Sequence, residues 1–329
     1  MKVESPLFLS ESEVEQLIPI KDCLSWVEQA LVEFSRGQVT APPRIRLLVP
    51  DGRTSFMPSY VPSREALACK IVSFYGKNLD RGLPTVISSL ALIDPRSGLL
   101  NCIMGATYIT AIRTGAIAGI AAKYLSMRQS ATVGVLGSGA LAHWGMTYLN
   151  MALEVKEVFV YSRNPANRQA YAQQLKEQLR KPIQVLENPD DVAASADILL
   201  CATSSKTPTY NGDLLREGAL VISLGANTPD TREIDQNTVL RSKIVVDSRE
   251  SALKECGEFI IPIREGLFSP DKVQTEIGQI IAGEVQAFPF QEKNLLLKSV
   301  GISAVDAMVA SHVFEHAQQK HMGTLIPTV

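Results

Sequence analysis

The regular alternation of short apolar runs with helical segments, which begins near residue 130, most constrains what this chain can fold into. The six apolar runs are ATVGVL, EVFVYS, IQVLE, DILLCA, ALVISLG and KIVVD. Short strands separated by helices predict parallel βαβ units, because a parallel connection needs a dozen or more residues and is usually helical. We therefore expect an α/β domain with a doubly wound parallel sheet of the Rossmann type over residues 126–299.

A glycine-rich turn, GSGALA at residues 137–142, follows the first predicted strand and precedes a helical segment. Gly137 would make the tight turn, Gly139 would let the backbone approach a pyrophosphate, and Ala142 would let the helix pack on the strand. The pyrophosphate would lie at a helix N-terminus, where free N–H groups and the helix dipole attract anions. A glycine turn in a ligand-free domain is the alternative. The predicted cofactor contacts in this turn are Gly137, Ser138, Gly139, Ala140 and Leu141.

The residues after the second predicted strand indicate which dinucleotide is bound. An NAD site usually has Asp or Glu there, and the carboxylate accepts hydrogen bonds from the ribose hydroxyls. Here the strand runs into Ser162 and Arg163. A carboxylate would repel a 2′-phosphate, whereas a guanidinium can bind it through two hydrogen bonds. We therefore expect NADPH (NADP) in preference to NADH, and the predicted contacts are Ser162, Arg163, Asn164 and Arg168. Alternatively, these arginines are solvated surface residues.

The first 125 residues show mixed helical and strand patterns and predict a separate α+β domain. Apolar side chains have helical spacing over residues 10–37, and two apolar runs flank Asp51-Gly52, which is a strong hairpin signal. Further strands are expected over residues 66–76 and 85–105, with a turn at DPRSG. The helical segment over residues 304–321 lies beyond the sixth strand of the other domain, and we expect it to return to this N-terminal region.

Three basic residues of the N-terminal region stand in apolar or small-residue surroundings: Arg44 in PPRIR, Lys70 in ACKIVS and Arg113 in AIRTGA. A buried cation needs a partner, and the chain offers no three obvious acids nearby. Three cations that converge on one pocket would suit a substrate carboxylate. The alternative for each residue is an internal salt bridge.

Composition and charge exclude several classes of protein. The formal net charge is −2 and no basic run is interleaved with aromatic residues, so neither nucleic acid nor a membrane is an expected partner. The N-terminus lacks a signal peptide's apolar stretch, and five widely spaced cysteines without a C-x-x-C motif fit reduced thiols in a cytoplasmic protein. His312 and His316 lie four residues apart without a third ligand, so no metal is expected.

A set of motifs occurs in order along nearly the whole chain: PPR, MPSY, CKIVS, GLPTV, RTGAIAGIAAKYL, GSGALA, GANTPDTREID, VVDSRESALKECGE and LKSVGISAVDA. With these motifs the chain resembles the ornithine cyclodeaminase and mu-crystallin family, which includes archaeal-type alanine dehydrogenases and ketimine reductases. The resemblance covers residues 5–325. It implies a homodimer in which residues 1–125 and 300–329 form the substrate-binding and dimerisation domain, and residues 126–299 bind the dinucleotide.

The resemblance also implies roles for individual residues. Arg44, Lys70 and Arg113 match the residues that bind the substrate carboxylate, and we expect them to form the catalytic set with Asn227 at the substrate. The implied cofactor contacts outside the regions above are Thr114, Thr203, Ser204, Lys298, Ser299 and Gly301.

One departure from the family pattern bears on the reaction. In the cyclodeaminases and alanine dehydrogenases of this family, the GAN motif would have Asp at its third place, and that carboxylate handles the substrate amine and proton transfers. Here the residue is Asn227, and an amide cannot take a proton at neutral pH. Ser55 stands where the cyclodeaminase has an acidic side chain near the distal amine of its substrate. Both differences disfavour an ornithine cyclodeaminase.

Of the family's reactions, reduction of a preformed imine depends least on that carboxylate, because a cationic C=N accepts a hydride without a dedicated acid. We therefore expect an NAD(P)H-dependent imine (ketimine) reductase acting on small α-imino acids such as pyrroline-2-carboxylate or piperideine-2-carboxylate. The alternatives are an alanine or N-substituted amino-acid dehydrogenase, an ornithine cyclodeaminase, and a non-catalytic protein that binds NADPH or another ligand.

Overall fold

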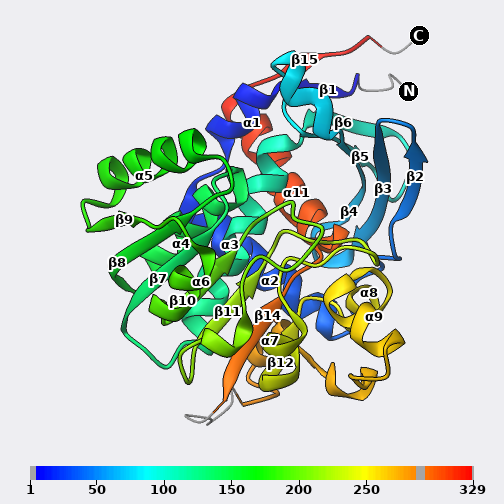
Figure 1. Ribbon diagram of the computed structural model, residues 1–329. Helices are drawn as coiled ribbons and strands as arrows, with labels where there is room; N and C mark the ends of the chain where they lie inside the picture. The colour runs from blue at the N-terminus through cyan, green and yellow to red at the C-terminus, as the bar shows by residue number, and fades with distance from the viewer. Residues whose placement is uncertain (1–4, 287–292, 328–329) are drawn as a thin grey trace. The chain divides into compact units, whose positions relative to one another are not determined.

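The computed structural model describes residues 5–286 and 293–327 (Figure 1). The chain divides into two compact units: unit 1 comprises Met1–Arg113 and Ile302–Val329, and unit 2 comprises Thr114–Gly301. The boundary falls inside the helix α3 (Thr107–Leu125), and the expected boundary between residues 125 and 126 falls at the end of this helix. The outermost residues of the expected domains, 1–4 and 328–329, lie outside the described residues. None of the described helices is both long and apolar enough to span a membrane.

Unit 1 is built on a seven-stranded mixed sheet with the strand order β15-β1-β6-β5-β4-β3-β2. Only β1 and β6 pair in parallel, and the other neighbours are antiparallel. The strands are β1 (Leu7–Leu9), β2 (Ile45–Val49), β3 (Gly52–Val61), β4 (Ala66–Phe74), β5 (Val86–Ile93), β6 (Leu100–Gly105) and β15 (Thr324–Leu325). Its helices are α1 (Glu11–Leu17), α2 (Ile20–Ser35), the start of α3, and α11 (Ser303–Lys320).

The predicted hairpin around Asp51-Gly52 is confirmed, because β2 and β3 pair antiparallel on either side of it. The helical pattern over residues 10–37 forms two helices instead of one. Ser10 and Glu13 form a capping box at the start of α1, and Ile18 is extended because the following Pro19 disfavours helical backbone there. The proline then starts α2, so the break has a local cause that periodicity alone does not show.

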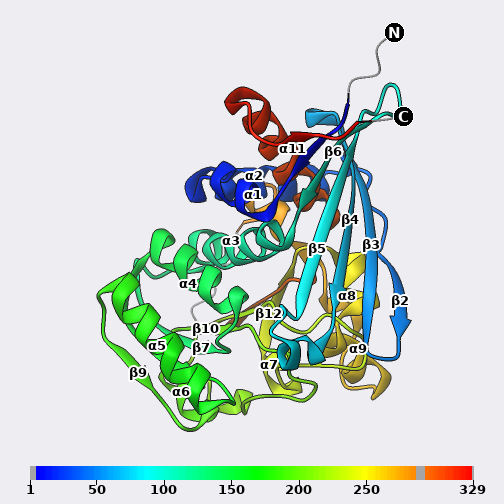
Figure 2. The same cartoon turned by 90° about the horizontal axis from the view of Figure 1, so that it is seen from above.

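One face of the unit 1 sheet is covered by helices, and Figure 2 shows α1, α2 and α11 on that face. Burial alternates along β3 and β4, and Ala66, Ala68 and Lys70 are the buried positions of β4. Two hydrogen bonds join the first residue of α11 to β3 on this face. Ser303 Oγ donates to Pro58 O (2.9 Å), and Ser59 Oγ donates to Ser303 O (3.0 Å). The expected return of the C-terminal helix to the N-terminal region is thus confirmed.

The opposite face of this sheet carries exposed apolar side chains. Across strands β2, β3 and β4, Ile45, Phe56 and Ile71 are register partners in one row. A second row of register partners begins at Leu47 on β2 and ends at Ile87 on β5. Ile45 is 61% exposed and Leu47 is 54% exposed. Large apolar residues gathered on one face of a sheet are typical of an interaction surface.

Unit 2 contains an eight-stranded sheet in the order β13-β12-β14-β11-β10-β7-β8-β9, and all its strands are parallel. Its strands are β7 (Ser130–Leu136), β8 (Glu154–Tyr161), β9 (Ile183–Val185), β10 (Ile198–Cys201), β11 (Leu220–Ser223), β12 (Ser242–Val246), β13 (Thr275–Glu276) and β14 (Asn294–Lys298). Its helices after α3 are α4 (Ala140–Ala152), α5 (Pro165–Leu179), α6 (Pro189–Ser195), α7 (Gln236–Arg241), α8 (Arg249–Glu255), α9 (Gly257–Arg264) and α10 (Ile277–Ile281).

The expected parallel Rossmann-type sheet is confirmed, and all six predicted strands are present. The structure adds β14, which inserts between β11 and β12 and is buried along its whole length (Figure 1). The strand order reverses between β7 and β10, which are neighbours in the sheet. In open α/β sheets, ligands bind beyond the carboxyl ends of the strands at such a reversal, so the loops after β7 and β10 mark the candidate cofactor site.

Candidate functional site

The turn after β7 has the backbone that a phosphate-binding loop requires. Gly137 adopts φ +118°, and a Cβ at this residue would lie 2.4 Å from Ala202 O in the loop after β10. Gly139 is the N-cap of α4 without a side-chain cap, and a Cβ there would meet nothing within 4 Å. Uncapped N–H groups at a helix start and open space beside a glycine fit a bound pyrophosphate. Of the other predicted contacts in this turn, Ala140 is exposed, and Ser138 and Leu141 are half-buried.

The end of β8 connects directly to the glycine turn. Ser138 Oγ donates to Ser162 Oγ at 2.9 Å, so the residue at the usual acidic position is a neutral hydroxyl that faces the turn. Arg163 is exposed, and Asn164 caps α5 by accepting a hydrogen bond from the backbone N–H of Asn167. Arg168 is buried and pairs with Glu187 at 2.6 Å, so its guanidinium already has a carboxylate partner. Of the two arginines, Arg163 is therefore the one left exposed to a phosphate.

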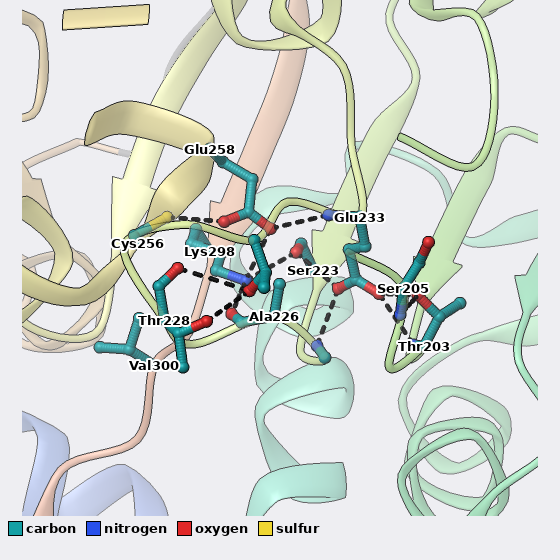
Figure 3. A network of polar contacts seen from close by, with 12 residues as sticks. Thr203, Ser205, Ser223, Ala226, Thr228, Glu233, Cys256, Glu258, Lys298 and Val300 are labelled. Atoms are coloured by element: carbon teal, nitrogen blue, oxygen red, sulfur yellow. Dashed lines mark hydrogen bonds and ion pairs between the residues drawn. The ribbon is translucent and has the colours of Figure 1, made fainter. Parts of the chain in front are cut away.

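The loop after β10 is held by a buried carboxylate, Glu233 (Figure 3). Glu233 accepts hydrogen bonds from the backbone N–H of Thr203 (2.8 Å) and from its hydroxyl (2.9 Å). It also accepts from Ser223 Oγ and from the backbone N–H of Gly225, both at 2.8 Å. The loops after β10 and β11 are thereby fixed to each other. Ser204 beside Thr203 is exposed.

Lys298, at the end of β14, is fully buried and its ammonium lies within the same network (Figure 3). It donates to Ser223 Oγ (3.0 Å), to the carbonyl of Ala226 and to Glu258 Oε1 (3.2 Å). Burial alone would lower the pKa of Lys298, but the charges of Glu258, Cys256 and Glu233 and the hydrogen bond to Glu258 together outweigh it and hold the pKa above its ordinary value. The ammonium therefore links the end of β14 to the loop that carries Asn227.

The segment after Lys298 is ordered by Asp247, the residue after β12. One carboxylate oxygen of Asp247 accepts from Ser299 Oγ (2.7 Å) and from the backbone N–H groups of Val300 (3.0 Å) and Gly301 (2.6 Å). Two of the predicted contacts, Ser299 and Gly301, thus share one buried anchor. Thr114, another predicted contact, is a buried residue of α3.

In unit 1 the structure brings Lys70 and Arg113 together around a carboxylate. Lys70 Nζ lies 2.6 Å from Asp306 Oδ2, and Arg113 Nε donates to Asp306 Oδ1 at 2.9 Å. Lys70 and Asp306 are each 1% exposed, and Arg113 is 5% exposed. The internal salt bridge is therefore present for both cations. In the part of the chain that the structure describes, Asp306 is the only carboxylate at ion-pair distance from either of them.

The environment of Lys70 moves its titration into the neutral range. Burial lowers the pKa of Lys70 to about 7; the nearby charge of Asp306 opposes this shift, and the charges of Arg113 and Arg44 add to it. Arg44 directly precedes β2 and is half-buried, so it belongs to the same electrostatic cluster. An ammonium that can lose its proton near neutral pH suits a proton donor.

Two further residues singled out in the sequence lie in different units. Ser55 is buried at an inward-facing position of β3 in unit 1, two residues before Met57, the register partner of Lys70. Asn227 is half-buried in unit 2 and follows Ala226, whose carbonyl Lys298 binds. Over residues 5–286 and 293–327, no three His, Cys, Asp or Glu side chains are grouped to hold a metal ion.

Sequence reasoning missed four acids that organise these parts: Glu233, Asp247, Glu258 and Asp306. All four are buried, and each contacts at least one residue that the sequence had singled out. Two of these acids stand among apolar residues in the sequence, in EFII and AVDAM. Such surroundings indicate a buried carboxylate with a cationic partner, since an unpaired charge is rarely buried.

Comparison with known proteins gives a consistent result along the whole chain. The chain is 31% identical over 323 residues to a Delta(1)-pyrroline-2-carboxylate reductase of Bacillus cereus, covering 97% of this chain and 99% of that protein. The solved Delta(1)-pyrroline-2-carboxylate reductase of Thermococcus litoralis, in complex with NADH and L-proline, has a TM-score of 0.94 at 36% identity and covers 97% of this chain and 100% of that one.

An archaeal alanine dehydrogenase dimer with bound NAD is also similar, with a TM-score of 0.93 at 29% identity over 99% of this chain and 100% of that one. The sequence profile of the ornithine cyclodeaminase/mu-crystallin family matches residues 4–321. The glycine turn at the strand reversal and the buried cationic cluster of unit 1 thus stand in a chain that belongs to the ornithine cyclodeaminase/mu-crystallin family.

Proposed function

We propose that this protein is a pyridine-nucleotide-dependent reductase of small α-imino acids, with pyrroline-2-carboxylate and piperideine-2-carboxylate as the substrate class. The observation that carries the proposal is the buried pair of Lys70 and Arg113, which are two cations around one carboxylate. When Lys70 is protonated, the trio with Asp306 has a formal charge of +1, and a substrate carboxylate balances it. The similarity to reductases named for pyrroline-2-carboxylate supports the same substrate class.

In this proposal unit 1 binds and protonates the substrate. Arg113 contacts Asp306 through Nε, which leaves its two terminal amino groups as a fork for a planar carboxylate. Lys70 Nζ donates a proton to the imine nitrogen, a step that its pKa of about 7 favours at neutral pH. A protonated C=N carries positive charge at the carbon that receives hydride, so this proton lowers the barrier to reduction.

Unit 2 holds the reductant. The bound nicotinamide nucleotide would supply the hydride, and the glycine turn with the start of α4 would bind its pyrophosphate. Glu233 and Lys298 keep the loops after β10 and β11 in one arrangement, so their contribution is the rigidity of the binding surface. Hydride and proton together convert C=N into CH–NH, which balances the reaction.

Within this function we propose that NADPH is preferred to NADH. Ser162 replaces a carboxylate that would repel a 2′-phosphate, and the adjacent Arg163 is exposed and positively charged. The solved relative from Thermococcus litoralis contains NADH, so the preference rests on the residues of this chain alone.

Asn227 supports imine reduction over the other family reactions. Alanine dehydrogenation and ornithine cyclisation must add water or release ammonia, and both need a group that exchanges protons with the amine. An amide does not serve this purpose at neutral pH. Ser55 likewise lacks the charge that would bind the distal amine of ornithine.

We also propose that the protein is a homodimer formed through the apolar face of the unit 1 sheet. Ile45, Leu47, Ile71 and Ile87 are exposed on the face opposite Lys70. A two-fold axis would pack this face against its own copy, and the related alanine dehydrogenase is a dimer. The substitution Ile71→Asp is expected to convert the dimer into monomers in light scattering with size-exclusion chromatography.

Steady-state oxidation of NADPH with a panel of substrates tests the proposed reaction. Pyrroline-2-carboxylate and piperideine-2-carboxylate are expected to be reduced, and pyruvate with ammonia is expected to react slowly. Ornithine with NAD is expected to release little proline or ammonia, and these products are measured directly because the cyclisation consumes no NADPH. Thermal-shift titration with NADPH, with and without the imine, separates catalysis from binding. Stabilisation by both ligands without NADPH oxidation would instead support a non-catalytic ligand-binding protein.

A further inference from the structure

Asp306 occupies the first turn of α11 and joins that helix to two other elements of unit 1. Its carboxylate contacts Lys70 from β4 and Arg113 from α3, and all three side chains are almost completely buried. Ser303 is fastened to Pro58 and Ser59 on β3, so the first turn of α11 is fixed independently of the charges. The carboxylate is therefore presented to the two cations from a rigid support.

The two oxygens of Asp306 have different partners. Oδ2 lies 2.6 Å from Lys70 Nζ and Oδ1 accepts from Arg113 Nε at 2.9 Å. A carboxylate that bridges in this way fixes the separation of the two cations. It also fixes the orientation of the guanidinium plane of Arg113, because Nε is the guanidinium nitrogen attached to Cδ. The two terminal amino groups then point away from Cδ.

We propose that Asp306 is a positioning residue that holds Lys70 and Arg113 in the geometry and charge state needed to bind and protonate an α-imino acid. The proposal rests on the proposed function, because it concerns the same site. Asp306 acts through these two partners and not on the reacting atoms.

The charges around Lys70 define the direction of the expected effect. Asp306 on α11 favours the ammonium, whereas Arg113 on α3 and Arg44 before β2 disfavour it. Removal of the negative charge of Asp306 leaves Lys70 facing two positive charges. The pKa of Lys70 is then expected to fall, so the amine loses its proton at a lower pH.

A purely structural salt bridge makes a different forecast. If Asp306 only fastens α11 to the sheet, its substitution lowers the melting temperature and leaves the pH profile of the folded fraction unchanged. Glu315 on the same helix, which pairs with the partly exposed Arg64, provides the matched control, because this pair is far from full burial and lies outside the proposed site.

The test compares Asp306→Asn, Asp306→Glu and the control Glu315→Gln in imine reduction across pH. Asp306→Asn is expected to lower kcat about tenfold or more and to move the alkaline limb of kcat/KM about one pH unit or more toward acid. Asp306→Glu keeps the charge but displaces it, so kcat is expected to fall by about threefold or more with the pH limb in place. Glu315→Gln is expected to match the unaltered protein in kcat and in the position of the alkaline limb of kcat/KM.

The proposal would be overturned if folded Asp306→Asn had the alkaline limb of kcat/KM at the same pH as the unaltered protein. If that variant does not fold, Asp306→Glu decides, and an unaltered kcat in it would overturn the proposal equally. The titration of Lys70, followed by NMR of protein labelled at lysine 13Cε and assigned with Lys70→Met, reports on Asp306 without turnover. Absence of imine reduction in the unaltered protein would count against the proposed function, whereas an identical Lys70 titration in the unaltered protein and Asp306→Asn would count against the role of Asp306.

Discussion

Lys70 and Asp306 come from a β-strand and a helix that are far apart in the sequence, yet their charged groups lie 2.6 Å apart in the interior of unit 1. Arg113 reaches the other oxygen of the same carboxylate. With Lys70 protonated, these three side chains carry one more positive than negative charge, and burial makes that excess unfavourable. An anionic ligand that enters the cluster therefore gains from charge balance as well as from hydrogen bonds.

Substitution of Arg113 should affect the imino acid and spare the nucleotide. Arg113→Ala is expected to raise KM for the imine and to lower kcat/KM by on the order of 30- to 1000-fold, about 2–4 kcal/mol, with nearly unchanged NADPH affinity. Arg113→Lys should restore activity only in part, because an ammonium cannot bind a carboxylate through a planar fork. Imine kinetics, NADPH titration and the melting temperature should be measured on one preparation. A destabilised variant with unaltered imine kinetics would contradict the role of Arg113 in binding.

Carboxylate binding should be accompanied by proton uptake on Lys70. The pKa of Lys70 is about 7, so this group is mostly neutral one unit above that pH. A bound carboxylate adds a negative charge, which raises the pKa and favours the ammonium. Near pH 8 the uptake should approach about one proton per site, and it should vanish well below pH 7, where Lys70 is already protonated. Calorimetry with pyrrole-2-carboxylate in two buffers of different ionisation enthalpy measures it, and Lys70→Met is the control that should show none.

Cofactor preference should depend on the two residues after β8. The unaltered protein is expected to bind NADPH about tenfold or more tightly than NADH, and Arg163→Ala should remove most of that difference. Ser162→Asp should reverse it, since a carboxylate accepts from ribose hydroxyls and repels a phosphate. Dissociation constants from fluorescence titration provide the measurement. Equal affinities for the two nucleotides in the unaltered protein would contradict the prediction.

The buried ion pair of unit 2 should be important for stability. Lys298→Met leaves Glu258 buried without its cation and is expected to destabilise the protein by about 3–5 kcal/mol. The double variant Lys298→Met/Glu258→Gln removes both charges and should lose less than the single variant. Lys254→Met, which disrupts an exposed pair with Glu250, should change stability by about 1 kcal/mol or less. Denaturant unfolding of the three variants makes the comparison, and equal losses for Lys254→Met and Lys298→Met would refute it.

The parallel sheet of unit 2 was predictable because each strand is a compact apolar run next to turn residues and a helix. The strand β14 was not, because its apolar run is only the three residues Leu295–Leu297, and periodicity does not distinguish so short a run from part of a buried helix. The break between α1 and α2 likewise depends on one proline in a continuous apolar pattern. These are local ambiguities that only the surrounding fold resolves.

The cations of the candidate site were predictable from their apolar surroundings, but their partner was not. Asp306 lies in a helix whose first residues are buried on all sides, so its sequence context has no amphipathic pattern that indicates which side faces β4. The contact with Lys70 arises only when α11 packs on the unit 1 sheet. Glu233 and Glu258 are similar in part, since Thr203 lies 30 residues before Glu233 and Lys298 lies 40 residues after Glu258.

The return of α11 to unit 1 has a consequence for the order in which the protein is made. The ribosome releases Lys70 and Arg113 long before Asp306, and the whole of unit 2 emerges in between. Unit 2 is one continuous stretch of chain and can fold as soon as it is released. Asp306 cannot pair with Lys70 and Arg113 until synthesis has passed residue 306, so in the nascent chain the unit 1 sheet lacks the cover of α11 until then.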